Sequence, residues 1–439
     1  GDTSVDSHKA LPLVSHSKEH IDLVELYPYK RMFDEGLVSV MVGHLNIPSL
    51  DPRPNYPTSI SQSIVTELLQ NEMQFEGLIF TDAMNMKGVS NYRIIDSIPS
   101  KAGEIELKAF LAGNDILLCS DNVPATIDIM RSAYQENVIS EERLSHSVKK
   151  ILHYKYKAGL NTKKTVETAN LISDINPASN EALQYQLFEN AVTVLQNKDN
   201  IIPIKNLQKN KIAYVKLGDG ENSNFAESLK KYTEITEIAS KDLDSLILKL
   251  KDFDLVILGF HKSDKAWRNQ DFTDAEMSWL QEIARKNKVI LDVFAKPYSL
   301  LKIPEFDNIE GLVVSYQNTN TSHIVSAELI FGAIEAKGKL PVSINSNFKV
   351  NEGLTTEKLN RLGFTAPENV GVNSAKLLEI EQIATKAIDE KVAPGIVVLV
   401  ARKGKVIYHK AFGYQTYEKE KKLTSTDLFD VASLTKMIA

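Results

Sequence analysis

The chain has 439 residues, of which 43% are hydrophobic and 25% are charged; its length predicts two or three globular domains. A formal net charge of -6 at pH 7 argues against a basic nucleic-acid-binding surface, and no apolar run is long enough to span a membrane. With Cys119 as the single cysteine, a disulfide framework and a cysteine-based metal cluster are excluded. We expect no cofactor and no metal ion.

The first 160 residues alternate short apolar runs with helical patterns. Residues 1–20 form a polar loop rich in Ser, His and Asp. The predicted strands are 37–45, 77–80 and 114–122, and the predicted helices are 60–73, 104–113, 122–136 and 141–158. Repeated strand–helix units predict part of a (β/α)8 barrel. A complete barrel needs about eight units, so we expect its first strands to precede Gly1.

Two further sections follow a polar connector at 161–189. Residues 190–348 again alternate apolar strands, such as 254–260 and 288–294, with helices. This pattern predicts an open α/β sandwich with a doubly wound sheet. A linker (349–372) leads to a third section (373–439) of α+β type. There the sequence predicts a helix at 374–390 and then a β-hairpin that turns at Lys403-Gly404. These few elements provide almost no core, so we expect this section to be truncated at its C-terminal end as well.

Two short motifs carry residues suited to glycosidic bond cleavage. Asp82 follows a predicted strand directly, at the strand end where barrel enzymes place catalytic groups, and a carboxylate there could attack an anomeric carbon. Asp6-Ser7-His8 places a carboxylate two residues from an imidazole that could donate a proton and later accept one. Taken alone, the two motifs favour a turn aspartate and a solvated loop histidine over catalytic groups.

Longer segments favour the catalytic interpretation. GDTSVDSHKALPLV resembles the loop of glycoside hydrolase family 3, β-N-acetylglucosaminidase branch, that ends in Asp-Ser-His. MVGHLNIPSLDPRPNYPTSIS resembles the next strand and loop of that family, and GLIFTDAMNMKGV resembles its nucleophile segment. AGNDILLCSDN and RLSHSVKKIL resemble its last strand and closing helix. These segments cover residues 1 to 160 in consistent order, which is more specific than any single motif.

The resemblance implies roles for individual residues. Asp82 matches the nucleophile, His8 the acid/base and Asp6 the carboxylate partner of His8. We also expect Met84 and His44 to contact substrate. The lysine and histidine with which the family contacts sugar hydroxyls would precede Gly1. Residues 190–348 resemble the C-terminal sandwich domain of the family, to which we assign a structural role.

The third section resembles a different family. APGIVVLVARKGKVIYHKAFGYQ followed by LFDVASLTKMIA is similar to the start of the serine β-lactamase and penicillin-binding-protein superfamily. The resemblance implies that Ser433 is an acyl-enzyme nucleophile and Lys436 its base, one helical turn apart. The Tyr-x-Asn and Lys-Thr-Gly segments of that superfamily would follow Ala439. We therefore expect negligible acyl transfer in this chain.

Three hypotheses follow for function. The first is a retaining exo-β-N-acetylglucosaminidase acting on amino sugars or muropeptides, with water or phosphate as the final acceptor. The second is a serine acyl-enzyme of the β-lactamase type, and the third is an inactive fragment in which only the sandwich domain folds independently. Two adjoining modules with cell-wall chemistry lead us to expect the cell envelope, the periplasm or the extracellular side as the location.

Overall fold

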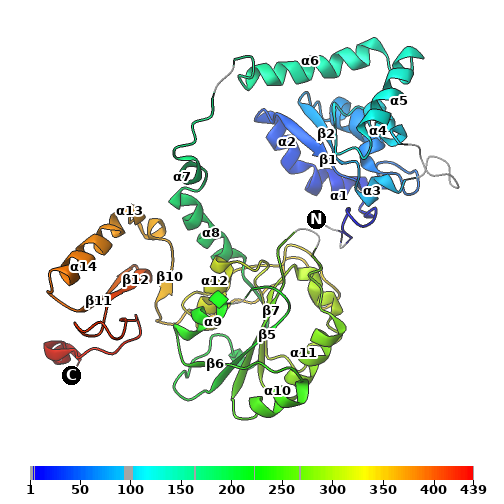
Figure 1. Ribbon diagram of the computed structural model, residues 1–439. Coiled ribbons are helices and arrows are strands. Elements are labelled where there is room, and N and C mark those ends of the chain that lie inside the picture. The colour runs from blue at the N-terminus through cyan, green and yellow to red at the C-terminus, as the bar shows by residue number, and fades with distance from the viewer. Residues whose placement is uncertain are drawn as a thin grey trace. The chain divides into compact units, whose positions relative to one another are not determined.

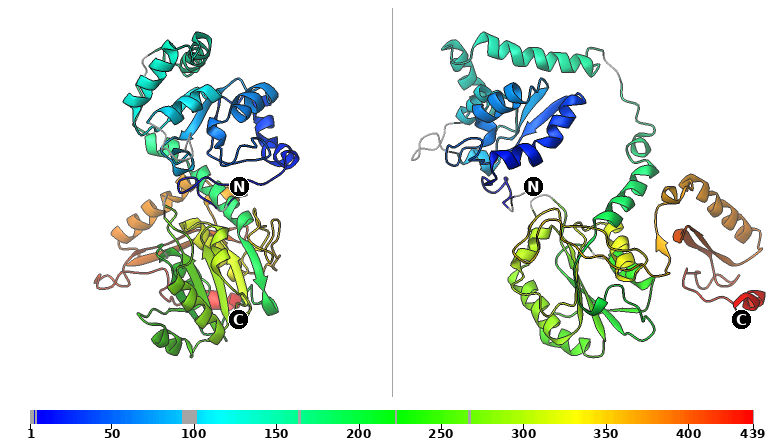
Figure 2. Two further views of the ribbon diagram at one scale, coloured as in Figure 1. Left: turned by 90° about the vertical axis from the view of Figure 1, so that its right-hand side faces the viewer. Right: turned by 180° about the vertical axis from the view of Figure 1, so that it is seen from behind.

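The computed structural model describes residue 3 and residues 5–92, 102–162, 165–221, 223–265 and 268–438. The chain divides into two compact units, Gly1–Glu167 and Thr168–Ala439 (Figures 1 and 2). Strands and helices alternate along both units, so the predicted α/β class is confirmed. Among the residues described, none of the helices has the length and apolar character that crossing a membrane requires.

Three parallel strands form the sheet of the first unit, in the order β1-β2-β3. They are β1 (Ser39–Val42), β2 (Leu78–Ala83) and β3 (Ile116–Leu118). The helices are α1 (Lys18–His20), η1 (Ile21–Glu25), α2 (Tyr27–Asp34), η2 (Thr58–Ile60), η3 (Ser63–Glu72), α3 (Lys87–Ser90), α4 (Glu104–Ala112), α5 (Val123–Gln135) and α6 (Glu141–Lys157). The predicted order of parallel strands and helices is confirmed. Three strands do not close a barrel, so the barrel itself stays a prediction.

The two faces of this sheet differ in how well they are covered. Ile79 is fully buried and packs with Val65 and Phe75 in a hydrophobic cluster. Successive side chains of a strand point to opposite faces, so Asp82 lies on the other face of β2. On that face of the sheet Met41, in β1, is 59% exposed. The predicted nucleophile therefore lies on the more accessible face.

The second unit contains a six-stranded sheet in the order β4-β9-β8-β7-β5-β6. All neighbouring strands are parallel except β4, which is antiparallel to β9. The strands are β4 (Thr193–Asn197), β5 (Ile212–Leu217), β6 (Ile235–Glu237), β7 (Leu255–His261), β8 (Val289–Phe294) and β9 (Gly311–Val314). The helices are α7 (Leu171–Ile175), α8 (Ala178–Ala191), η4 (Lys198–Asn200), α9 (Ser223–Lys230), α10 (Leu243–Leu250), α11 (Asp274–Lys286), η5 (Pro297–Lys302) and α12 (Asn320–Ile330).

Helices cover both faces of this sheet (Figure 1). Leu246 of α10 and Ile283 of α11 belong to the hydrophobic cluster on one face. Tyr185 of α8, Phe225 of α9 and Val325 of α12 belong to the cluster on the other face. Parallel strands are buried on both sides in such folds, which explains their continuous apolar runs. The predicted doubly wound sandwich is confirmed.

The linker before the third section contains a short strand that the sequence did not predict. The section and the segment before it contain β10 (Gly363–Phe364), η6 (Pro367–Val370), α13 (Ser374–Leu377), α14 (Glu379–Asp389), β11 (Gly395–Arg402), β12 (Lys405–Gly413), η7 (Ala432–Leu434) and α15 (Thr435–Ile438). β10 pairs in parallel with β12. The helix predicted at 374–390 is divided at Leu378 into α13 and α14. The predicted hairpin turn is confirmed, with positive φ at Lys403 (53°) and Gly404 (76°).

A buried ion cluster joins the hairpin to the sandwich. Glu328 of α12 is fully buried, and its carboxylate lies 3.1 Å from Nζ of Lys405 in β12. Glu189 of α8 lies 2.8 Å from the same Nζ, and the backbone N–H of Phe364 donates to Glu328. Burial raises the pKa of Glu328 to about 7, although the neighbouring Lys405 charge lowers it. The lysine thus neutralises a carboxylate that has no access to water.

Lys405→Met is therefore expected to destabilise the second unit by about 3 kcal/mol, because one partner of a buried pair is removed. The loss should be larger at pH 8.5 than at pH 5, since Glu328 can take up a proton at the lower pH and then needs no cation. Urea unfolding at the two pH values measures both effects. Lys410→Met is the matched control, because its partner Glu381 is 37% exposed and such surface pairs contribute little. Equal losses in the two variants would contradict the role given to Lys405.

Candidate active site

Asp82 lies at the end of β2 and is half-buried. Its Oδ1 accepts a hydrogen bond of 2.8 Å from the backbone N–H of Ala83. The preceding Thr81 is fully buried, and its Oγ1 accepts from the backbone N–H of Leu118 over 3.1 Å. β2 is thus held to β3 directly before the nucleophile candidate. The carboxylate is placed on a rigid strand end.

Asp6 and His8 form the pair that their spacing predicts. Oδ1 of Asp6 lies 3.0 Å from the backbone N of His8 and 2.8 Å from its Nδ1. The backbone hydrogen bond from His8 lowers the pKa of Asp6 below its usual value, and the side-chain hydrogen bond adds to this. A charged carboxylate only accepts, so Nδ1 carries a hydrogen. Proton exchange with a substrate would then involve Nε2.

The loop that carries this pair is attached to the first unit at two places. The backbone N–H of Gly88, in α3 just after Asp82, donates to the carbonyl oxygen of Ser7 over 2.9 Å. Val14 donates to the carbonyl oxygen of Asn46 over 2.9 Å, and Asn46 donates back to the loop at Pro12 over 2.8 Å. The loop therefore lies beside both strand ends. It brings His8 to the same end of the sheet as Asp82.

His44 lies beside the segment that follows Asp82. Its side chain is fully buried, with Nδ1 2.7 Å from Oγ of Ser59 and Nε2 3.0 Å from the carbonyl oxygen of Ala83. Burial lowers the pKa of His44; the Ala83 carbonyl and the Asp82 charge oppose this, and the His8 imidazole reinforces it. His44 thus bonds to the residue that follows Asp82.

The substrate contacts predicted for His44 and Met84 need revision. Both ring nitrogens of His44 are taken up by protein partners. Met84 is only 3% exposed and packs in a hydrophobic cluster with Tyr56 and Val89. Neither side chain presents a polar atom to a sugar, because tertiary packing has enclosed both. We therefore assign them to the support of the site.

Sequence reasoning missed Ser59 and Gly88. A Cβ atom at Gly88 would lie 2.9 Å from the carbonyl oxygen of Ser7 and 3.2 Å from Cβ of His44. Only a residue without a side chain allows the three segments to meet at this point. The glycine just after the nucleophile segment was a usable signal. Nothing in the sequence distinguishes Ser59 from the serines around it.

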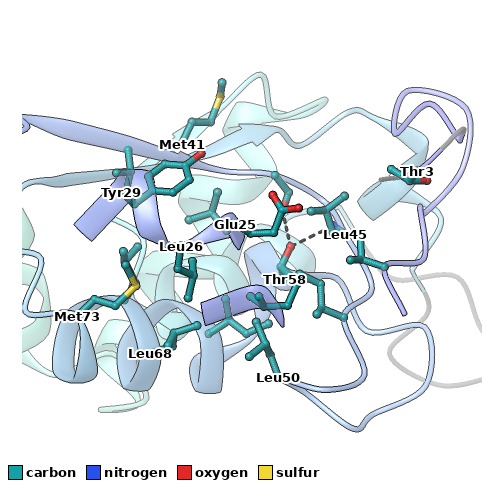
Figure 3. A pocket seen from close by; sticks show the side chains of 18 residues that line it. Thr3, Glu25, Leu26, Tyr29, Met41, Leu45, Leu50, Thr58, Leu68 and Met73 are labelled. Carbon is teal, nitrogen blue, oxygen red and sulfur yellow. Dashed lines mark hydrogen bonds between the residues drawn. The ribbon is translucent and has the colours of Figure 1, made fainter. Parts of the chain in front are cut away.

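A pocket of about 280 Å³ lies elsewhere in the first unit (Figure 3). It is lined mainly by apolar side chains such as Leu26, Leu45 and Leu68, with Thr58 hydrogen-bonded at its wall. Neither Asp82 nor His8 lines it. The pocket separates η1 and α2 from η3 and offers few polar groups to orient a sugar. We therefore place the candidate site at the strand ends and not in this pocket.

Ser433 and Lys436 are exposed and lie in η7 and α15. Within the described part of the chain, no side-chain hydrogen bond joins them. The two residues lie about one helical turn apart, as the sequence predicted, but they fall in two short consecutive helices. Among the described residues, no base is hydrogen-bonded to this serine.

A carboxylate and an imidazole near the ends of parallel strands are groups that a glycoside hydrolase could use. Residues 1–154 match the model described as glycosyl hydrolase family 3 N terminal domain. Residues 380–439 match the model described as beta-lactamase. Both resemblances seen in the sequence are confirmed.

Two bacterial proteins are similar to parts of the chain. Beta-hexosaminidase A of Pseudoalteromonas piscicida is 24% identical over 403 residues, which cover 79% of this chain and 64% of that protein. Beta-hexosaminidase of Nitrosomonas eutropha is 30% identical over 147 residues, which cover 33% of this chain and 39% of that protein. The chain thus spans less than two thirds of the length of either relative.

Solved structures share the fold. A glycoside hydrolase family 3 beta-N-acetylglucosaminidase from Paenibacillus sp. str. FPU-7 matches with a TM-score of 0.64 and 22% identity, covering 79% of this chain and 66% of that chain. Beta-glucoside phosphorylase BglX matches with a TM-score of 0.65 and 20% identity, covering 78% of this chain and 64% of that chain. At these identities the likeness establishes architecture alone.

Proposed function

We propose that the chain carries the nucleophile and the acid/base of a retaining exo-β-N-acetylglucosaminidase. The observation that supports this most is the hydrogen bond from Gly88 to Ser7, which holds the Asp6–His8 loop beside the segment that follows Asp82. A retaining glycosidase needs a nucleophilic carboxylate and a separate proton donor at one bond. The names of the two beta-hexosaminidase relatives support an amino sugar as substrate.

The reaction would proceed by two displacements. The Asp82 carboxylate attacks the anomeric carbon while protonated His8 gives its Nε2 proton to the glycosidic oxygen, so that the bond to the leaving group breaks. Neutral His8 then removes a proton from water, whose oxygen attacks the same carbon and releases Asp82. Asp6 keeps the imidazole in one orientation through both steps. Terminal N-acetylglucosamine from peptidoglycan fragments or related amino sugars is the proposed substrate.

The alternative of a serine acyl-enzyme is less well supported in this chain. It depends on Ser433 and Lys436, which are not hydrogen-bonded to each other in the described residues. The Asp6–His8 loop is hydrogen-bonded to the segment after Asp82, which supports the glycosidase instead. We therefore place the proposed activity in the first unit.

The complete gene product should release the β-anomer of N-acetylglucosamine from an aryl β-N-acetylglucosaminide, as followed by proton NMR before mutarotation. The matching aryl β-glucoside should react at least about tenfold more slowly, because a single substrate group can contribute that much to discrimination. Repeating the reaction in phosphate separates hydrolysis from phosphorolysis, which would yield a sugar 1-phosphate. Release of the α-anomer as the first product would contradict the double displacement.

A further inference from the structure

Ala83 makes hydrogen bonds through both of its peptide groups, and both bear on the candidate nucleophile. Its N–H donates to Oδ1 of Asp82 over 2.8 Å. Its carbonyl oxygen accepts from Nε2 of His44 over 3.0 Å and from the N–H of Met86 over 3.0 Å. We propose that His44 is a positioning residue that, through Ala83, holds the carboxylate of Asp82 in the orientation needed for attack. This inference rests on the proposed function and adds a residue to its machinery.

The hydrogen bonds determine which nitrogen of His44 carries the hydrogen. A carbonyl oxygen can only accept, so Nε2 must be the donor to Ala83. In a neutral imidazole Nδ1 is then an acceptor, and Oγ of Ser59, 2.7 Å away, is its donor. Burial lowers the pKa of His44 and so favours this neutral form. The ring therefore has one tautomer and one orientation.

The support behind His44 is itself rigid. Ser59 is fully buried, and its carbonyl oxygen accepts from Nδ2 of Asn114 over 2.8 Å. The neighbouring Thr58 donates its N–H to the carbonyl oxygen of Leu45 over 2.8 Å and accepts from Leu45 through Oγ1 over 3.0 Å. Oγ1 of Thr58 also donates to the carbonyl oxygen of Gly43, so η2 is held to the backbone on both sides of His44. A side chain supported in this way can fix the backbone that it contacts.

His44 also contacts the region that carries the proton donor. Its Cβ lies close to Gly88, whose N–H binds the carbonyl oxygen of Ser7. The same residue therefore touches the segment after Asp82 and the point at which the Asp6–His8 loop is attached. A shift of His44 would move the nucleophile relative to the proton donor. Misplacement by about 1 Å can lower a rate by about 100-fold.

The test compares two substitutions of His44 in the complete gene product. His44→Phe keeps an aromatic ring but removes both hydrogen bonds, and kcat for an aryl N-acetylglucosaminide should fall about 10- to 100-fold while KM changes less than about threefold. His44→Gln returns an amide donor at the place of Nε2 and should recover at least about tenfold of the lost kcat. The inference is wrong if folded His44→Phe keeps wild-type kcat, or if His44→Gln is no better than His44→Phe.

Two further variants complete the test. Ser147→Ala removes a buried hydroxyl that is bonded to Asp115 in the same unit, and it should lower stability without changing kcat. If His44→Phe does not fold, Ser59→Ala replaces it: loss of the Nδ1 partner should lower kcat about fivefold or more, and an unchanged kcat would overturn the inference. Failure of the proposed function is distinguishable, since Asp82→Asn would then remain active whatever the behaviour of His44.

Discussion

Asp82→Asn should reduce turnover of an aryl β-N-acetylglucosaminide by about 10⁴-fold in the complete gene product, the scale on which removal of a nucleophile acts. An amide oxygen is a poor nucleophile, so the covalent glycosyl-enzyme no longer forms. The substitution should leave the fold intact, because the amide oxygen can still accept from the N–H of Ala83. Steady-state kinetics together with a circular dichroism spectrum measure both expectations.

Azide sharpens the test of Asp82. In Asp82→Ala the space of the carboxylate is vacated, and azide entering it should attack the anomeric carbon as the aryl group leaves. The product should be the α-glycosyl azide, of opposite configuration to the β-substrate, because one displacement replaces two. Asp128→Asn is the control: this exposed carboxylate pairs with Arg131 on α5, and its loss should leave kcat unchanged. Wild-type turnover in Asp82→Asn would remove the nucleophile assignment and with it the proposed mechanism.

His8→Ala should make the rate depend strongly on the leaving group. General acid catalysis contributes about 10²–10⁴-fold where the departing oxygen needs a proton. For a disaccharide or alkyl N-acetylglucosaminide, kcat/KM should therefore fall on the order of 10³-fold. For a 4-nitrophenyl substrate it should fall less than about tenfold, because this phenolate departs without protonation. A series of aryl substrates with graded phenol pKa values measures the slope.

The hydrolysis of the glycosyl-enzyme, which is the second step, tests the role of His8 independently. Without a base to activate water, the glycosyl-enzyme should accumulate, so that kcat and KM for the 4-nitrophenyl substrate decrease together. His16→Ala is a matched control from the same N-terminal segment, where His16 stacks on His20 at a centroid separation of 4.0 Å, and it should behave as wild type. Equal losses across all leaving groups would instead mean that His8 only holds the loop.

The fold followed from the sequence wherever local pattern decides structure. Continuous apolar runs such as 254–260 and 288–294 predicted buried parallel strands, and Lys403-Gly404 predicted the turn of a hairpin. The antiparallel pairing of β4, the added strand β10 and the division of the helix at Leu378 were not predicted. Each depends on which segment lies alongside, and a single chain pattern does not encode that neighbour.

The sequence likewise predicted some features of the candidate site and not others. Asp82 at a strand end and the Asp6–His8 spacing could be recognised because their chemistry depends on residue type and on near neighbours in the chain. The hydrogen bond from Gly88 to Ser7 joins positions 81 residues apart, and the one between His44 and Ala83 joins positions 39 apart. No local pattern predicts such pairs, and His44 was accordingly assigned to substrate instead of to support.

By itself the sequence determined the class of fold, the candidate residues Asp82, Asp6 and His8, and the family resemblance of residues 1 to 160. Periodicity and motif order are properties of the linear chain. The tertiary structure alone decided that His44 and Met84 are enclosed and that Glu328 is matched by Lys405. It also decided that the loop of His8 lies against the helix that follows Asp82. A side chain becomes buried, and gains hydrogen-bond or ion-pair partners from distant residues, only when those segments meet in the fold. These contacts determine whether a polar group is free to bind substrate or instead supports its neighbours.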